Sequence, residues 1–234
     1  MVVWNNNKLT KNILVPLRFH PHTMSKQYTT QQFAQMLENC KHFDSDNRFT
    51  GAYDLCKAIE KSTEPLEESL EKRICSAFIQ HLEDDSLEVR TNSVRCILLI
   101  TGKIRESNIM LIVQKLGQEI VTGSSQTLDV FSLTVRGILE KTKDEQAANI
   151  IGALQPNLLK GIEQGIEEVK CECLSIFTEM FKHLGPFILR QPSLIQKENL
   201  MRAISNQMKI DSTPALRKRA SYCLGQFAVI LNST

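Results

Sequence analysis

The chain has 234 residues, of which 42% are hydrophobic and 23% charged, a balance typical of a folded globular protein. Its formal net charge of +2 is too small for a strong overall field, so binding to nucleic acid or a membrane surface would need a local patch. No apolar run reaches the roughly 18 residues of a membrane helix. Only 10 Gly and 7 Pro occur, and no two-residue alternation persists, which favours an all-α protein.

The seven cysteines are odd in number and lack the spacing of a disulfide framework or a metal site. Most of them fall at apolar helix positions, so we expect reduced, buried thiols in a cytoplasmic and nuclear protein. Residues 1–24 are basic, with no acidic residue before Met24, and are predicted to be a disordered or extraneous extension. Residues 25–234 are predicted to form one repeat array, the N-terminal part of a longer one.

Helical patterns occur in pairs along the chain. The pairs are predicted at 27–42 with 47–61, 66–82 with 89–100, 108–121 with 127–141, 147–162 with 166–184, and 194–210 with 213–231. Pro156 is expected to kink or split its helix, because proline removes one helical hydrogen bond. Residues 185–193, which contain two prolines, are predicted to be a longer connection.

The second helices share a template of core-facing positions at i, i+4, i+7 and i+11, which places them on one helix face. The second of these positions is always small, as expected where two helices approach closely. The four clear copies are Val89, Ser93, Cys96, Ile100; Leu128, Ser132, Val135, Leu139; Val169, Cys173, Ile176, Met180; and Leu216, Ala220, Cys223, Phe227. In the first pair Asn47 and Gly51 fit the template, whereas Asp54 is polar at its third position.

The template starts at residues 47, 89, 128, 169 and 216, which are 42, 39, 41 and 47 residues apart. Two-helix units at this period are the signature of HEAT or armadillo repeats, and two helices per unit favour HEAT. The sequence therefore predicts an all-α, right-handed α-solenoid of about five HEAT repeats, each touching only its neighbours.

Basic residues recur directly after the first template position. We expect them to bond neighbouring repeats in a polar ladder of Arg90, Lys170 and Arg217. The cluster 217–219 lacks interleaved aromatic residues, which disfavours a nucleic-acid site. Six residues at exposed second-helix positions are our candidate partner contacts: Arg48, Asn92, Arg95, Glu172, Lys218 and Arg219.

Catalytic chemistry finds little support. Cys171 and Cys173 point about 200° apart on a helix, so they do not form a metal-ligand pair. Cys40 with His42, or Cys75 with His81, could be imagined as nucleophile pairs, but both lie in amphipathic helices without an oxyanion setting. We predict no enzyme activity, no cofactor, no metal and no small-molecule substrate.

The last helix, PALRKRASYCLGQFAVIL, resembles the "AVRKRxxxALGxL" helix of the cullin-associated and neddylation-dissociated protein family. Asp46-Asn47-Arg48-Phe49 followed by Asp54-Leu55 resembles the first repeat of that family. Leu82-Glu83-Asp84 with Glu88-Val89 and Val94-Arg95-Cys96, and then Ala147-Ala148-Asn149, match further pieces in order. The resemblance covers about residues 27–231, and the tail before Met24, Asp54 and Asp129 depart from it.

This resemblance implies a non-catalytic scaffold that binds unmodified cullin–RING ubiquitin ligases and regulates their assembly, neddylation and substrate-receptor exchange. The implied partners are the cullin C-terminal region and its RING subunit, with no membrane. Two alternatives stay open: a generic HEAT adaptor of the transport-receptor or phosphatase-scaffold type, and an enzyme that uses Cys and His.

Overall fold

The computed structural model of the protein describes residues 28–122 and 126–231, so the extension predicted over residues 1–24 lies outside the described part. The described residues form ten α-helices, one short 3-10 turn and no strand. The helices are α2 (Thr30–Asn39), α3 (Ser45–Lys61), α4 (Glu68–His81), α5 (Leu87–Ile100), α6 (Glu106–Thr122), α7 (Leu128–Lys141), α8 (Asp144–Gln164), α9 (Glu167–Arg190), α10 (Lys197–Asn206) and α11 (Pro214–Leu231), with the 3-10 turn η1 at Pro192–Leu194.

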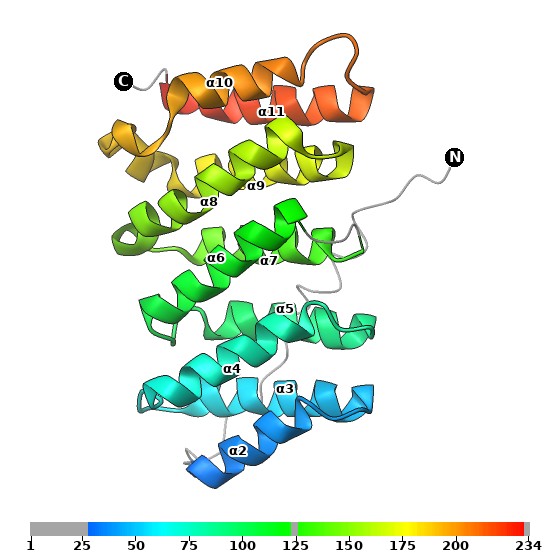
Figure 1. Cartoon of the computed structure of the whole chain (residues 1–234). Coiled ribbons are helices and arrows are strands. Elements are labelled where there is room, and N and C mark those ends of the chain that lie inside the picture. Colours follow the sequence, from blue (N-terminus) through cyan, green and yellow to red (C-terminus); the bar gives the residue numbers. More distant parts are fainter. Residues whose placement is uncertain (1–27, 123–125, 232–234) are drawn as a thin grey trace, which may run out of the picture.

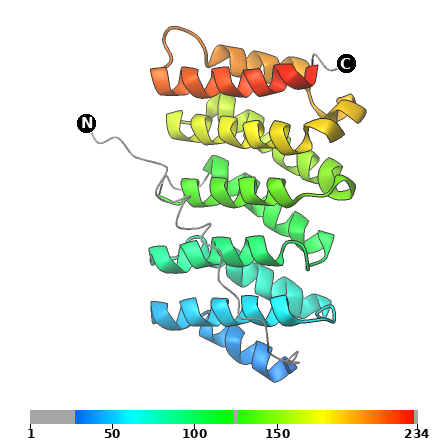
Figure 2. The ribbon, with the colours of Figure 1, turned by 180° about the vertical axis from the view of Figure 1, so that it is seen from behind.

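The helices form five antiparallel pairs that stack in chain order, and they lie in two layers. The first helices of the pairs face the viewer in Figure 1, and the second helices face the viewer in Figure 2. Along the second layer α3 packs on α5, α5 on α7, α7 on α9 and α9 on α11. The predicted α-solenoid of five helix pairs is confirmed.

Local capping explains why the second helices begin where they do. The side chain of Asp44 accepts a hydrogen bond from Asp46 N at 2.8 Å, and Ser86 Oγ accepts one from Val89 N at 3.5 Å. Thr213 Oγ1 accepts one from Leu216 N at 3.2 Å. Each side chain satisfies an N–H that has no partner within the helix, so a short polar loop suffices to start the second helix.

The template positions form the core of the stack. All sixteen residues of the four clear copies are buried, and so are Gly51 and Ala58 in the first pair. Asn47 and Asp54 are the two template residues that are not buried, and α3 lies beside only one other repeat. Fully burying a large aliphatic side chain contributes about 1.5–3 kcal/mol, so this continuous core supplies most of the stability.

The small second position allows each second helix to approach the first helix of its own pair. Ser93 Oγ donates to the carbonyl of Phe78 in α4 at 2.5 Å. A Cβ at Gly51 would lie only 2.8 Å from Cys40 N and 2.9 Å from the carbonyl oxygen of Met36 in α2. The expectation of close helix approach at this position is therefore confirmed for both pairs.

The prediction of a connection over residues 185–193 is wrong. Helix α9 continues through Pro186 to Arg190, and α8 likewise runs unbroken through Pro156. Both prolines are exposed, so each removes a hydrogen bond on the solvent side of its helix. Beyond Pro186 the side chains of Phe187 and Ile188 are buried, and this burial outweighs the lost bond.

Candidate protein-binding surface

Neither a metal site nor a membrane span finds support in the described residues. No group of three or more His, Cys, Asp or Glu side chains within residues 28–122 and 126–231 could hold a metal ion. In the same ranges no helix is long and apolar enough to cross a bilayer. All seven cysteines are free thiols, six of them buried. Burial raises the pKa of Cys40, Cys75, Cys173 and Cys223 to about 12, which keeps these thiols protonated and unreactive.

The recurring arginine at the start of the second helices holds the loop that precedes its own helix. Arg90 Nη1 donates to the carbonyls of Asp84 at 2.5 Å and Asp85 at 3.2 Å. Arg217 Nη1 donates to the carbonyl of Ile210 at 3.1 Å and to that of Ser212. Because these acceptors lie within the same pair, the ladder between repeats predicted for Arg90 and Arg217 is wrong.

Arg48 belongs to the same set, although we selected it as a partner contact. Its Nη1 donates to the carbonyl of His42 at 3.0 Å and to that of Phe43 at 2.7 Å. These acceptors lie six and five residues before Arg48, and the acceptors of Arg90 lie six and five residues before Arg90. The third ladder residue, Lys170, is half-buried in a hollow that the α10–α11 loop also lines. Sequence reasoning missed these clamps, because a backbone carbonyl acceptor leaves no trace in the residue pattern.

A polar ladder between repeats does exist, and it uses the template position i+3. Asn92 Nδ2 donates to the carbonyl of Phe49 in α3 at 3.1 Å. Glu172 accepts from Ser132 Oγ of α7 at 2.5 Å. Arg219 Nη1 donates to Ser175 Oγ of α9 at 2.9 Å. Three residues that we selected as partner contacts therefore link consecutive second helices.

Five of the six candidate contact residues are partly or fully buried. Asn92 is 4% exposed, and Arg48, Glu172 and Arg219 are half-buried with the intramolecular bonds just described. Arg95 is half-buried on α5, and only Lys218 is exposed. Their contact with a partner stays a prediction, and Lys218 is the one best placed for it.

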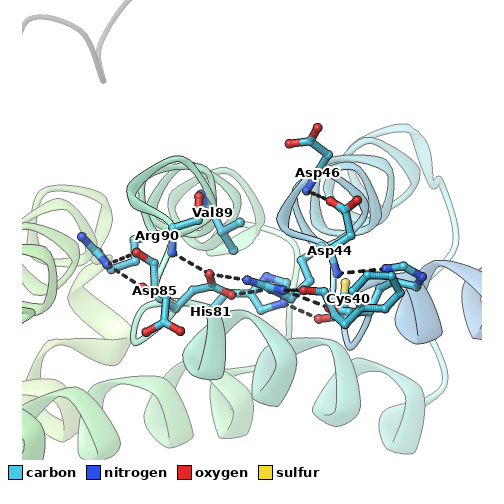
Figure 3. A network of polar contacts seen from close by, with 12 residues as sticks. Cys40, Asp44, Asp46, His81, Asp85, Val89 and Arg90 are labelled. Atoms are coloured by element: carbon cyan, nitrogen blue, oxygen red, sulfur yellow. Dashed lines mark hydrogen bonds and ion pairs between the residues drawn. The ribbon is translucent and has the colours of Figure 1, made fainter.

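The first two loops are joined by an ion pair (Figure 3). Arg48 binds Asp84 with both ends of its guanidinium, Nε–Oδ2 at 2.6 Å and Nη2–Oδ1 at 2.8 Å. Figure 3 shows Asp44 and Asp46 at the α3 end of this network and Arg90 with Asp85 at the other end. Burial raises the pKa of Asp84, but the bonds from Arg48 and from Ser86 N outweigh it and lower the pKa overall.

Two buried groups on α4 connect it to the pairs on either side. His81 is 3% exposed, and its Nε2–H donates to the carbonyl of Cys40 at 2.7 Å. Burial lowers the pKa of this histidine and so favours its neutral form. Glu71, 2% exposed, accepts from Arg105 N at 2.7 Å, Arg105 Nη1 at 2.5 Å and Asn108 Nδ2 at 2.6 Å. These bonds tie the second helix pair to the first and to the third.

The fold and its polar joints define an armadillo- or HEAT-like repeat solenoid, a class whose extended surfaces bind other macromolecules. A designed armadillo repeat protein in complex with the peptide (KR)4 shares this fold, with a TM-score of 0.50 and 15% identity over 84% of this chain and 82% of that one. No protein-family model matches the chain.

The sequence is similar to proteins named cullin-associated NEDD8-dissociated proteins, which confirms the family resemblance. It is 28% identical over 204 residues to cullin-associated NEDD8-dissociated protein 1 of Dictyostelium discoideum, covering 83% of this chain. It is 27% identical over 212 residues to cullin-associated NEDD8-dissociated protein 1 of Drosophila melanogaster, covering 89% of this chain. It is also 27% identical over 203 residues to cullin-associated NEDD8-dissociated protein 2 of Mus musculus, covering 83% of this chain. The matches span 16% of the length of each of these relatives.

Proposed function

We propose that this chain is a non-catalytic repeat scaffold that binds cullin–RING ubiquitin ligases lacking the ubiquitin-like modifier. The observation that carries the proposal is the similarity to cullin-associated NEDD8-dissociated proteins of an amoeba, an insect and a mammal, together with the shared repeat fold. The names of these relatives couple cullin association to the absence of NEDD8. From the family resemblance we further propose that the chain binds the cullin C-terminal region and its RING subunit.

Regulation follows from such binding. A scaffold that occupies the unmodified cullin opposes modification of that cullin, and we propose that it thereby regulates assembly of the ligase and exchange of its substrate receptors. Reduced buried thiols fit a cytoplasmic and nuclear location. The proposed role needs a binding surface and no reacting group, and burial raises the pKa of the Cys173 and Cys223 thiols to about 12, which keeps them protonated.

The test is a binding titration of the chain with an unmodified cullin–RING complex. The matched control is the same complex carrying the ubiquitin-like modifier. We expect saturable binding to the unmodified complex and affinity at least about tenfold weaker, or 1.4 kcal/mol, for the modified one. Absence of binding to every unmodified cullin–RING complex tried would overturn the proposal. Capture of a transport cargo or a phosphatase instead would favour a generic HEAT adaptor.

A further inference from the structure

One edge of the solenoid carries a row of exposed apolar side chains. The loops that join the two helices of a pair lie at the right-hand edge of Figure 1. Four of them, residues 42–46, 83–88, 163–168 and 209–213, lie wholly within the described part of the chain, and we name these four segments the loop edge. Each segment exposes one large apolar side chain: Phe43 at 89%, Leu87 at 55%, Ile166 at 61% and Ile210 at 97%.

The backbone of the loop edge is held in place. Arg48 binds the carbonyl of Phe43, Arg90 those of Asp84 and Asp85, and Arg217 that of Ile210. Adjacent loops are also tied to one another, through the Arg48–Asp84 ion pair. A rigidly presented side chain loses little entropy on binding, so this arrangement is suited to docking.

Two further loops are linked by a single hydrogen bond, in which Thr213 Oγ1 donates to Glu167 at 2.6 Å. Three of the four segments are therefore clamped by an arginine of their own pair, and all four are joined to a neighbouring segment. The exposed apolar side chains stand on this framework at intervals set by the stacking of the helix pairs. Isolated exposed apolar residues are common. Here they recur at one edge, one in each of the four segments, whereas residues 122–127, which join the third pair, include no large apolar residue.

The charge of the loop edge is strongly one-sided. Its exposed charged residues are nine carboxylates and one ammonium group: Asp44, Asp46, Glu83, Asp85, Glu88, Glu163, Glu167, Glu168 and Asp211 against Lys209. The arginines that clamp the loops are half-buried and directed at backbone carbonyls. The field at this edge is therefore negative although the whole chain carries +2, and it selects a cationic partner.

We propose that the loop edge binds an extended, basic segment of a partner protein that presents one apolar side chain to each of the four segments. Packed helices lie about 8–10 Å apart, so neighbouring loops repeat at that spacing. A polyproline II segment rises 3.1 Å per residue with three residues per turn, so every third side chain faces the same way at about 9 Å intervals. Such a segment matches the loop spacing with one apolar residue in three and leaves the others for Lys or Arg.

This inference goes beyond the proposed function, because it concerns the chemistry of the surface and not the identity of the protein that carries the segment. A competing surface lies in the layer of the first helices, where a groove of about 490 Å³ separates α2 from α4. Lys41, Lys72 and Arg73 line that groove, so it would prefer an acidic segment. The sign of the net charge on the peptide that binds therefore distinguishes the two surfaces.

The experiment uses the full chain and two fluorescent peptides, each of five triplets: Leu-Arg-Pro as the basic probe and Leu-Glu-Pro as the acidic probe. The test variant combines Phe43→Ser, Leu87→Ser, Ile166→Ser and Ile210→Ser. All four residues are exposed, and serine is a favoured residue at the helix start that Ile166 occupies, so folding is retained. The control variant combines Tyr222→Ser and Leu99→Ser, which are exposed apolar residues away from the loop edge.

We expect the basic probe to bind the wild-type chain and the control variant equally, and the test variant at least about tenfold more weakly. Replacing Glu88 and Glu168 by Lys is expected to weaken the basic probe in the same way. Equal binding by the test variant, or preference for the acidic probe, would overturn the inference. A titration with an unmodified cullin–RING complex separates the two proposals: if it fails while the basic probe binds through the loop edge, the proposed function falls and this inference stands.

Discussion

Gly51 is the most stringent test of the close packing between the helices of a pair. A Cβ at this position would lie 2.8 Å from Asn39 Cβ and from Cys40 N, and 2.9 Å from the carbonyl oxygen of Met36. Two of these three atoms are backbone atoms, of Met36 in α2 and of Cys40 directly after it, and backbone cannot rotate away as a side chain can. Gly51→Ala therefore forces α2 and α3 apart, and overpacking of this kind costs about 1–3 kcal/mol.

The matched control is Gly152→Ala in the middle of α8, where a Cβ would meet nothing within 4 Å. Replacing a helical glycine by alanine stabilises the helix by about 1 kcal/mol, so Gly152→Ala should raise the unfolding midpoint. In Gly51→Ala this gain is set against the steric cost, and we expect the net result to be destabilising by up to about 2 kcal/mol. For a chain of this size 1 kcal/mol shifts Tm by about 2–4 °C.

The assay is thermal unfolding followed by far-ultraviolet circular dichroism. Because a repeat array can unfold in parts, hydrogen exchange should accompany it and should show faster exchange confined to α2 and α3. If Gly51→Ala were as stable as Gly152→Ala, with unchanged exchange in α2, the close approach of these two helices would be refuted.

Three further predictions follow from buried polar groups and thiols. Glu71→Ala removes the carboxylate that accepts from Arg105 and Asn108, and it should cost about 3–5 kcal/mol in urea unfolding. The control is Glu68→Ala, an exposed change on the same helix, which should stay within about 0.5 kcal/mol. Burial lowers the pKa of His81 below 6.5, so the contribution of the neutral histidine to stability is present above pH 6.5 and is lost as the pH falls. Tm should therefore drop on acidification from pH 7, and it should drop less in His81→Gln. Burial raises the pKa of Cys40, Cys75, Cys173 and Cys223 from 9.0 to about 12. At pH 8 a thiol reagent should therefore modify these cysteines about 1,000-fold more slowly than in the unfolded chain. A single cysteine that reacts much faster than the others would revive the enzyme hypothesis. The stability that these thiols give is complete below pH 9 and is lost as the pH rises towards 12.

The core of the repeats was predictable because it depends on periodicity. The spacing of Val89, Ser93, Cys96 and Ile100 is a local property of the sequence. Its recurrence at intervals of 39–47 residues identifies the helix pairs without any knowledge of the contacts between them. The prolines were less predictable. Pro186 gives the same signal in a loop and on the exposed side of a helix, and the burial of Phe187 and Ile188 beyond it decides between them.

The polar joints were the least predictable, since they connect residues 34–46 positions apart or use backbone acceptors. Asn92 and Glu172 look like exposed polar residues on a helical projection, and only the neighbouring helix shows them to be links between repeats. Glu71 carried a readable signal, because it is a carboxylate beside Leu70 on the apolar side of α4. The apolar residues of the loop edge carried another, since each interrupts an acidic, polar turn.

The central claim is the proposal that the chain binds an unmodified cullin–RING complex. Hydrogen exchange of the chain, measured with and without that complex, tests it most directly, because it also locates the surface that becomes covered. We predict slower exchange in the described residues at saturating complex; if the complex docks on the loop edge, the slowing falls at residues 42–46, 83–88, 163–168 and 209–213. No protection at saturating complex would contradict the claim, and protection confined to α4, α6 and α8 would show that the complex docks away from the loop edge.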